Sequence, residues 1–211
     1  MANALDPEEG GWVLDAGCGS GMLLPLLTDK LKGGGRYLGI DILSAGLGAL
    51  TGRARRLQLQ DALSSVQADL KRTMPLKDNS ISCAAAHFSV YTLREKEDRQ
   101  RVFRDLWRVL KPGGRLATAN PTDSYHAETI IRASLENLKR QGRSWMFKKL
   151  FVYPLTLRLG LKHVERQLQS RVWHGYRPDE LADEVEQAGF SVEQSETVYG
   201  GSGCLVVARK P

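Results

Sequence analysis

An apolar run that ends in three alternating glycines is the feature that most constrains the fold of this chain. Residues 13–21 read Val-Leu-Asp-Ala-Gly-Cys-Gly-Ser-Gly. The apolar start is typical of a buried strand, and glycines adopt positive φ and let a ligand approach the backbone closely. Because ligands of open α/β sheets bind beyond the carboxyl ends of the strands, we expect a ligand site at this turn.

The spacing of these glycines disfavours two classes of nucleotide-binding protein. The dinucleotide fingerprint G-x-G-x-x-G requires a glycine at position 22, where this chain has Met22. The phosphate-binding loop G-x-x-x-x-G-K-[ST] is not found in the sequence either. A dehydrogenase is therefore a distant alternative.

Strand and helix patterns alternate along the chain. Expected strands cover 11–15, 36–43, 65–70, 81–89, 115–119, 190–198 and 204–209, and expected helices cover 21–32, 44–59, 95–110, 127–140 and a segment from 178 that Gly189 ends. Such alternation predicts a parallel, doubly wound α/β sheet, and the short link between the last two strands predicts an antiparallel pair. The segment 111–114, Lys-Pro-Gly-Gly, is predicted to be a turn and not a site.

The positive charge is concentrated in one segment. The net charge is +6, but Lys139 to Arg171 holds nine lysines or arginines and one acid, Glu165, for a local charge of +8. The rest of the chain therefore carries −2. A local basic surface is indicated, which disfavours a dedicated nucleic-acid-binding protein.

Cysteine usage and hydropathy indicate the compartment. Cys18, Cys83 and Cys204 lie in or beside apolar runs without metal-ligand spacing, so we expect buried reduced thiols, no metal site and a cytoplasmic location. The sequence contains no apolar run of about 18 residues, and its first ten residues are acidic. Neither a transmembrane helix nor a signal peptide is expected.

The segment from Asp15 to Gly21 resembles motif I of the class I S-adenosylmethionine-dependent methyltransferases. Gly-Ile-Asp at 39–41 and Ala-Asp-Leu at 68–70 resemble the acidic ends of that family's second and third strands. Arg-Val-Leu-Lys-Pro-Gly-Gly at 108–114 resembles a signature of its small-molecule subgroup (type 11, ubiquinone/menaquinone-like). The resemblance covers roughly residues 12–120 and 178–209.

The resemblance implies a fold, a cofactor and a set of site residues. The implied fold is a Rossmann-like, doubly wound, seven-stranded sheet of order 3-2-1-4-5-7-6 with strand 7 antiparallel, in a single domain (1–211) with an inserted helical substrate cover (121–177). The implied cofactor is S-adenosylmethionine, and the product is S-adenosylhomocysteine. The implied cofactor-binding residues are Asp15, Gly17, Cys18, Gly19, Gly21, Asp41, Ile42, Asp69, Leu70, His87 and Phe88.

The chemistry of two acids agrees with these roles. A carboxylate at Asp41 can accept two hydrogen bonds from a ribose diol, and Asp69 can accept one from an adenine amino group, next to the backbone N–H of Leu70. The alternatives are a loop or cap residue for Asp41 and a turn acid before Lys71 for Asp69.

A catalytic base is needed only for some acceptors. Methyl transfer from a sulfonium depends mainly on alignment, but a hydroxyl or acidic carbon acceptor must also lose a proton. His87, Tyr91, His126 and His174 are candidates by type, and His87 is favoured because it follows the fourth strand. A structural role is the alternative for each.

The segment 121–177 is where we expect the acceptor to be selected. Ala127 to Arg140 is compatible with an amphipathic helix, and 145–155 mixes aromatic, apolar and basic residues. A packed cover helix, a lid over a hydrophobic substrate, and peripheral contact with an anionic membrane or a nucleic acid remain open. Only eleven residues precede the first strand, fewer than in most family members, which predicts a more open cofactor site or one completed by another chain.

The sequence therefore predicts an enzyme that methylates a small-molecule, lipophilic acceptor. One alternative is an RNA or protein methyltransferase that uses the basic 139–171 surface. The other is a non-catalytic module that binds S-adenosylmethionine.

Overall fold

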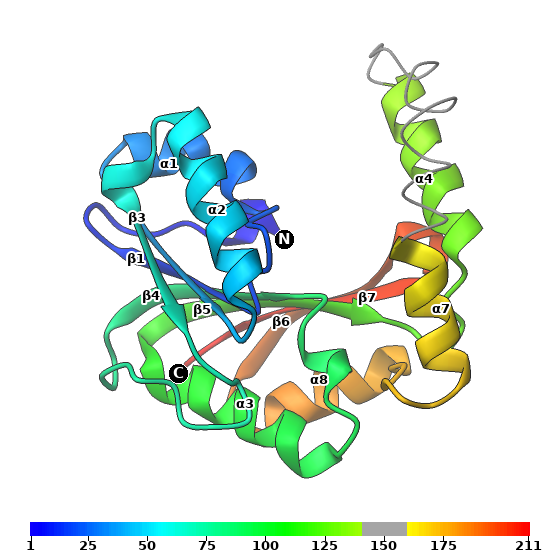
Figure 1. Cartoon of the computed structure of the whole chain (residues 1–211). Helices are drawn as coiled ribbons and strands as arrows, with labels where there is room; N and C mark the ends of the chain where they lie inside the picture. The colour runs from blue at the N-terminus through cyan, green and yellow to red at the C-terminus, as the bar shows by residue number, and fades with distance from the viewer. Residues whose placement is uncertain (141–159) are drawn as a thin grey trace.

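One seven-stranded sheet forms the centre of the molecule (Figure 1). The computed structural model describes residues 1–140 and 160–211. The strand order is β3-β2-β1-β4-β5-β7-β6, with β1 to β5 paired in parallel and β7 antiparallel to both β5 and β6. The strands are β1 (Trp12–Ala16), β2 (Arg36–Asp41), β3 (Leu63–Gln67), β4 (Ile81–His87), β5 (Leu110–Pro121), β6 (Ser191–Val198) and β7 (Gly203–Arg209). The predicted doubly wound order and the antiparallel last strand are confirmed.

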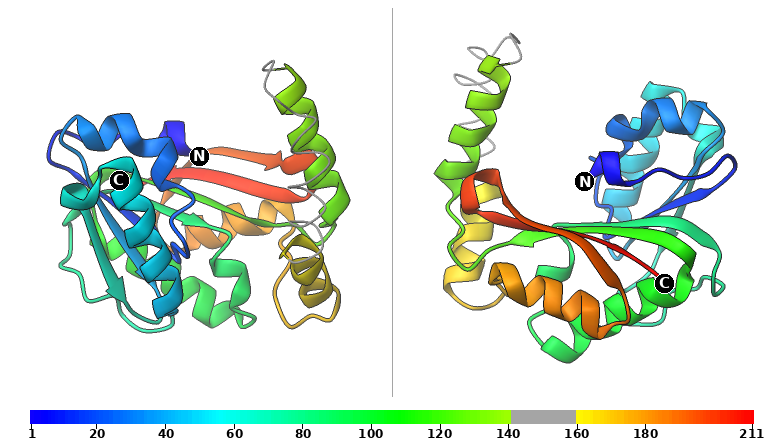
Figure 2. Two further views of the ribbon diagram at one scale, coloured as in Figure 1. Left: turned by 45° about the horizontal axis from the view of Figure 1, so that its top comes forward. Right: turned by 180° about the vertical axis from the view of Figure 1, so that it is seen from behind.

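Helices cover both faces of the sheet, as Figures 1 and 2 show. α1 and α2 lie on one face, and α3 and α8 lie on the other. The α-helices are α1 (Thr28–Lys32), α2 (Ser44–Leu57), α3 (Lys96–Val109), α4 (Ala127–Arg140), α7 (Lys162–Gln169) and α8 (Pro178–Gln187). The 3-10 helices are η1 (Ala2–Ala4), η2 (Leu24–Leu27), η3 (Gln60–Ala62), η4 (Val90–Thr92) and η7 (Tyr199–Gly201).

Two apolar cores hold these layers together. On the first face, Leu27 and Leu50 pack with residues of β1, β4 and β7, and the N-terminal segment adds the fully buried Leu5. On the second face, Phe103 of α3 and Leu181 of α8 pack against the opposite side of the strands. The burial of strand side chains on both faces is the pattern expected of a sheet covered on both sides.

The described part of segment 121–177 contains α4 and α7, which confirms the helix expected at 127–140. α4 rises from the carboxyl edge of the sheet and projects away from it (Figure 1). Its first turn packs on η7, where a Cβ at Gly200 would lie 2.8 Å from Thr129 Cγ2. The aromatic and basic stretch 145–155 lies outside the described residues.

Three local predictions differ from the structure. The helix expected over 21–32 is η2 followed by the short α1, because Pro25 enters at the first turn of the 3-10 segment. The third strand ends at Gln67 and not at residue 70, since Asp69 begins a turn. The segment 111–114, predicted to be a turn, belongs to the irregular start of β5. Gly113 adopts a φ of +76° there and donates its N–H to Lys210 O at 2.8 Å.

The cysteine prediction is confirmed, because Cys18, Cys83 and Cys204 are all buried and free. Burial raises the pKa of each thiol to about 12, which keeps these side chains protonated. Among the residues that the structure describes, none of the helices is long and apolar enough to cross a membrane.

Candidate functional site

A cavity of about 430 Å³ lies at the carboxyl ends of β1, β2, β3 and β4. This is the edge at which doubly wound sheets bind ligands, and the volume suits a small organic ligand. Its walls are Gly17, Gly19, Asp41, Ile42, Leu43, Ala68, Asp69, Leu70, Lys71, Phe88, Ser89, Thr92 and Leu93.

The glycine loop after β1 forms one wall and is held by backbone contacts. The N–H groups of Gly17 and Cys18 donate to Ile40 O at 2.8 and 3.0 Å. Gly17 has a φ of +77°, and a Cβ on it would lie 2.3 Å from Ser89 Cβ, so only glycine lets the loop approach the end of β4. Above Gly19, in contrast, a Cβ would meet nothing within 4 Å, which leaves open space for a ligand.

Asp41, the last residue of β2, presents a fixed carboxylate to the cavity. Its Oδ2 accepts the N–H of Gly19 at 2.7 Å, and its Oδ1 accepts the N–H of Leu43 at 2.9 Å. Each carboxylate oxygen has a further lone-pair direction available. The geometry therefore provides two acceptor atoms, already oriented, for a ligand that carries paired hydroxyls.

Asp69 begins a turn and also lines the cavity. Its Oδ1 accepts the N–H of Lys71 at 2.9 Å and its carbonyl accepts the N–H of Arg72 at 2.9 Å, so Asp69 does begin a turn. The same residue, with Leu70, lines the cavity. A turn acid and a ligand-facing acid are here the same side chain.

Asp15 lies beneath the glycine loop and not on the cavity wall. It is 3% exposed and accepts a hydrogen bond from the hydroxyl of Tyr37. Burial raises the pKa of Asp15 to about 6, the charge of Asp41 adds to the rise, and the Tyr37 hydrogen bond opposes it. This carboxyl group therefore joins β1 to β2 through Tyr37, just before the loop begins.

The structure brings seven of the eleven predicted cofactor residues to one cavity. These are Gly17, Gly19, Asp41, Ile42, Asp69, Leu70 and Phe88. Among the other four, Gly21 lets α2 pack closely, since a Cβ there would lie 2.3 Å from Leu50 Cδ1. The Cys18 side chain packs under Gly39. Asp15 lies below the loop, and His87 pairs with a residue near the last strands.

The partner of His87 is a residue that the sequence did not single out. The Nε2 of His87 lies 3.0 Å from the hydroxyl of Tyr199, in η7 between β6 and β7. The Phe88 ring contacts both members of this pair, with its centroid 4.9 Å from that of His87 and 5.7 Å from that of Tyr199. Burial lowers the pKa of His87 and raises the pKa of Tyr199, so at neutral pH the pair is an imidazole and a phenol.

The remaining candidate bases lie elsewhere. Tyr91 is 5% exposed, and burial raises its pKa to about 12. His126 lies at the base of α4, 3.4 Å from Glu165 Oε1. His174 lines a second cavity, described below. None of these three lines the cavity beside Gly17.

Sequence reasoning missed six wall residues and Tyr199. Ala68 belongs to the Ala-Asp-Leu segment at 68–70 but was not assigned to the cofactor. Leu43, Lys71 and Ser89 each adjoin a predicted residue, so extending those predictions by one position would have found them. Thr92 and Leu93 lie at the end of the 3-10 turn η4, which no motif marks. Tyr199 is 112 residues away from His87 in sequence and carries no local signal.

Comparison with known proteins agrees with this geometry. Residues 14–118 match a family model described as a methyltransferase domain. The chain is 27% identical over 203 residues to the 2-phytyl-1,4-naphtoquinone methyltransferase of Nostoc punctiforme, a match that covers 96% of this chain and 82% of that protein. It is 35% identical over 123 residues to an uncharacterized 37.1 kDa protein in transposon TN4556 of Streptomyces fradiae, and the match covers 57% of this chain and only a third (33%) of that protein.

The fold is also that of solved methyltransferases. The crystal structure of a SAM-dependent methyltransferase from Aquifex aeolicus superposes with a TM-score of 0.67 at 20% identity, covering 99% of this chain and 86% of the other. The chain belongs to the class I S-adenosylmethionine-dependent methyltransferases. The cofactor of this family is S-adenosylmethionine, which leaves as S-adenosylhomocysteine.

The cavity of this methyltransferase has the features that such a cofactor needs. Open space lies above Gly19, where a Cβ would reach no atom within 4 Å. The carboxylate of Asp41 is oriented by two backbone N–H groups at the same wall. The apolar residues Ile42, Leu70 and Phe88 line the same cavity.

Proposed function

We propose that this methyltransferase binds S-adenosylmethionine in the cavity beside Gly17 and transfers its methyl group to a lipophilic small molecule of the quinol type. Asp41 would accept the ribose hydroxyls, and Asp69 with Leu70 would contact the adenine. The glycine loop would hold the amino-acid portion. The observation that carries this assignment is the carboxylate of Asp41, fixed at 2.7 Å from Gly19 N at the cavity wall.

The rings beside Phe88 support an aromatic or polyprenyl acceptor. The ring centroid of Phe88 lies 5.9 Å from that of Tyr91 and 5.7 Å from that of Tyr199. Because Phe88 lines the cavity, this aromatic cluster adjoins it. Aromatic surfaces favour flat apolar ligands. A relative that matches over most of its length is named as acting on a phytyl naphthoquinone, which agrees with this class.

The cofactor supplies an electrophilic methyl group on a sulfonium, so the protein's task is alignment. For an acceptor that carries a hydroxyl, His87 is the base that we propose, because it is neutral and lies at the end of β4. Tyr199 would position its imidazole. The segment 121–177, whose described part holds α4 and α7, would cover the acceptor.

Three finer assignments accompany this function. We place the protein in the cytoplasm, in line with its three buried free thiols. We expect a small molecule and not a nucleic acid as substrate, because the net positive charge is concentrated in residues 139–171 and the rest of the chain carries −2. Peripheral contact of that segment with an anionic membrane would bring the enzyme to a lipophilic substrate.

Calorimetry with S-adenosylmethionine and S-adenosylhomocysteine tests the cofactor site. Asp41→Ala should weaken binding about ten-fold or more, because charge-assisted hydrogen bonds worth roughly 1.5–3 kcal/mol are lost. Asp61→Ala, in η3 and outside the cavity, is the matched control and should bind as the unaltered chain does. Unchanged affinity in a folded Asp41→Ala protein would remove the ribose assignment.

An acceptor screen tests the reaction itself. We would supply 2-alkyl-1,4-naphthoquinols, benzoquinols and lipids, and follow S-adenosylhomocysteine release together with the mass of each acceptor. Methylated quinol is the expected product. RNA that binds in a salt-dependent way and gains methyl groups would instead support the RNA alternative. Cofactor binding without turnover on any of the compounds would favour the non-catalytic module.

A further inference from the structure

A second cavity, of about 490 Å³, lies beside the cofactor cavity. Its walls come from segments far apart in the chain: Arg94 after η4, Asp123 after β5, and Arg171, Trp173 and His174 after α7. None of these residues lines the cofactor cavity, and none has a role in the proposed methyl transfer.

The charge of this cavity favours an anion. Its lining contains two arginines, Arg94 and Arg171, and one acidic residue, Asp123. Arg94 is paired only loosely, because its Nε lies 3.9 Å from Glu95 Oε1 and both side chains are 70% exposed. Arginine presents planar N–H groups that match carboxylate and phosphate oxygens.

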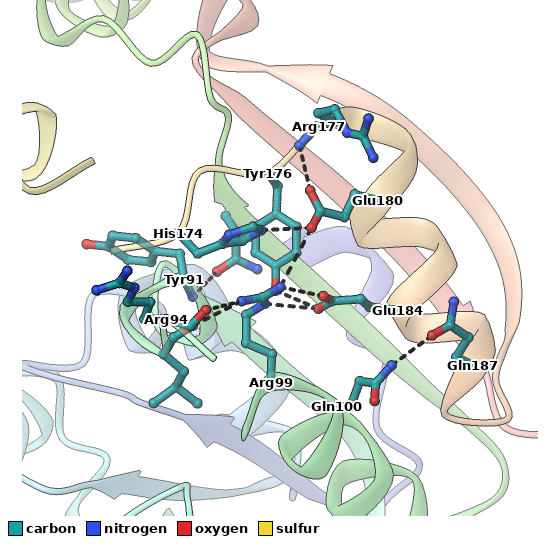
Figure 3. Close-up of polar contacts among 12 residues, drawn as sticks. Tyr91, Arg94, Arg99, Gln100, His174, Tyr176, Arg177, Glu180, Glu184 and Gln187 are labelled. Atoms are coloured by element: carbon teal, nitrogen blue, oxygen red, sulfur yellow. Dashed lines mark hydrogen bonds and ion pairs between the residues drawn. The ribbon is translucent and has the colours of Figure 1, made fainter. Parts of the chain in front are cut away.

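A buried network holds one side of the cavity in place (Figure 3). The guanidinium of Arg99, which is 2% exposed, donates to both oxygens of Glu184 at 2.7 and 3.2 Å. The same guanidinium donates to the carbonyl of Arg94 at 2.6 Å. The backbone that carries Arg94 is therefore fixed from inside the protein, so this part of the wall is preorganised.

His174 joins the other side of the cavity to the same network. Its backbone N–H donates to Tyr91 O at 2.9 Å, and its Nε2 lies 3.0 Å from Glu180 Oε1 (Figure 3). Burial lowers the pKa of His174, and the charge of Arg99 lowers it further, although the two glutamates oppose this. The imidazole is therefore neutral at neutral pH, and the positive charge comes from the arginines.

The two cavities are separated by one short segment. Thr92 and Leu93 line the cofactor cavity, and the next residue, Arg94, lines the second. Aromatic rings connect the two walls: Phe88 contacts Tyr91 at 5.9 Å, and Tyr91 contacts Trp173 at 5.2 Å. A ligand lying along Phe88 and Trp173 would have its apolar body near the cofactor and its far end near Arg94.

We infer that this second cavity binds an anionic group, a carboxylate or phosphate, carried by the methyl acceptor. Arg171 and Arg94 would bind the anion, and Trp173 would contact the adjoining apolar part. The inference rests on the proposed function and narrows it, because the preferred quinol-type acceptor then also carries an acidic group.

Binding of a matched acid and ester tests this inference without turnover. The probes are 1-hydroxy-2-naphthoate and its methyl ester, titrated calorimetrically into enzyme saturated with S-adenosylhomocysteine. The acid should bind about ten-fold tighter than the ester, the effect of a charge-assisted hydrogen bond. Arg171→Gln and Arg94→Gln should each weaken acid binding, by up to about five-fold, and leave the ester unchanged, because both residues are exposed and each supplies part of the positive charge.

Two further variants serve as controls, because acid binding should strengthen in one and stay unchanged in the other. Asp123→Asn removes the carboxylate from the cavity, so the acid should bind about two-fold tighter. Arg104→Gln removes a charge from an exposed position of α3 outside the cavity and should change nothing. Affinity for S-adenosylhomocysteine in each variant reports that the fold is intact.

Equal affinity for acid and ester would overturn the inference, as would an acid preference that survives both arginine substitutions. Inorganic phosphate that binds as tightly as the acid and displaces it would identify a site for free anions and not for an acceptor. Failure of the proposed function has a different signature: the acid preference persists and depends on Arg171, but no acidic or neutral acceptor is methylated.

Discussion

The two cavities of this methyltransferase are built in opposite ways. The cofactor cavity is formed by the ends of consecutive strands, and its key contacts are backbone hydrogen bonds such as those of Gly17 and Gly19. The second cavity is lined by residues of three separate connections, including Arg94, Asp123 and His174, and by the end of α7. The first cavity is thus shaped by geometry that the fold repeats, whereas the second is lined largely by connections, which vary more readily in sequence.

The network behind the second cavity should give the largest effect when it is broken. Glu184→Gln removes the charge that compensates Arg99, and both side chains are almost fully buried. Leaving Arg99 without that partner should lower the free energy of unfolding by about 3 kcal/mol or more, as measured in urea. Cofactor affinity of the folded protein should stay the same, because α8 does not line the cofactor cavity.

Replacing both partners distinguishes charge from packing. Arg99→Met with Glu184→Gln should recover much of the lost stability, because no unpaired charge is then buried. A Glu184→Gln protein that loses less than about 1 kcal/mol would show that Glu180, 3.6 Å from Arg99, is a sufficient partner.

The stability of the protein should depend on pH through the buried carboxyl group of Asp15. The pKa of Asp15 is about 6 in the folded protein against an ordinary 3.8, so the folded state binds this proton more tightly than the unfolded state does. Stability should therefore fall as pH rises from about 4 to about 6, by up to about 3 kcal/mol. Asp15→Asn should remove this slope, and the variant should be more stable than the unaltered chain at pH 7 and equal to it near pH 4.

Urea unfolding across this pH range provides the measurement, and Tyr37→Phe is the companion variant. The hydrogen bond from Tyr37 opposes the rise in the pKa of Asp15, so its removal should steepen the loss of stability with pH. The two substitutions therefore move the slope in opposite directions. A pH slope that persists unchanged in Asp15→Asn would assign it to other groups.

Tyr199 tests how the cofactor cavity is joined to the last strands. Tyr199→Phe removes the hydroxyl that lies 3.0 Å from His87 Nε2 while keeping the ring that contacts Phe88. We expect kcat on a hydroxylated acceptor to fall about ten-fold and its pH profile to shift, with cofactor affinity unchanged. A uniform loss of activity at every pH would indicate a packing role only.

The smallest effect distinguishes two glycines of α2. A Cβ at Gly48 would meet nothing within 4 Å, so Gly48→Ala should raise stability by about 0.5–1 kcal/mol. A Cβ at Gly46 would lie 3.1 Å from Gly19 O, so Gly46→Ala should weaken cofactor binding instead. Thermal unfolding with and without S-adenosylhomocysteine measures both, and equal behaviour of the two variants would contradict the close approach of α2 to the loop.

The contrast between the two cavities also explains which parts of the fold and of the candidate site could be predicted from the sequence. The position of the ligand edge and seven of the thirteen wall residues of the cofactor cavity follow from motifs at strand ends, and the order of the strands follows from the family that these motifs resemble. Residues such as Asp41 and Asp69 are recognisable because each follows a run of strand character. The packing of Cys18 against Gly39 and of Gly21 against Leu50 was not predicted, because local spacing does not reveal which side of a loop packs inward.

Short-range patterns therefore determined the family, the cofactor and the edge of the sheet where chemistry takes place, since backbone conformation and strand periodicity depend on neighbouring residues. Only the tertiary structure decided that His87 meets Tyr199, that Arg99 and Glu184 pair behind Arg94, and that Arg171 joins Arg94 in a second cavity. These contacts join residues tens of positions apart. Their partners are chosen by how helices and loops pack on the sheet, and a linear pattern does not record that packing.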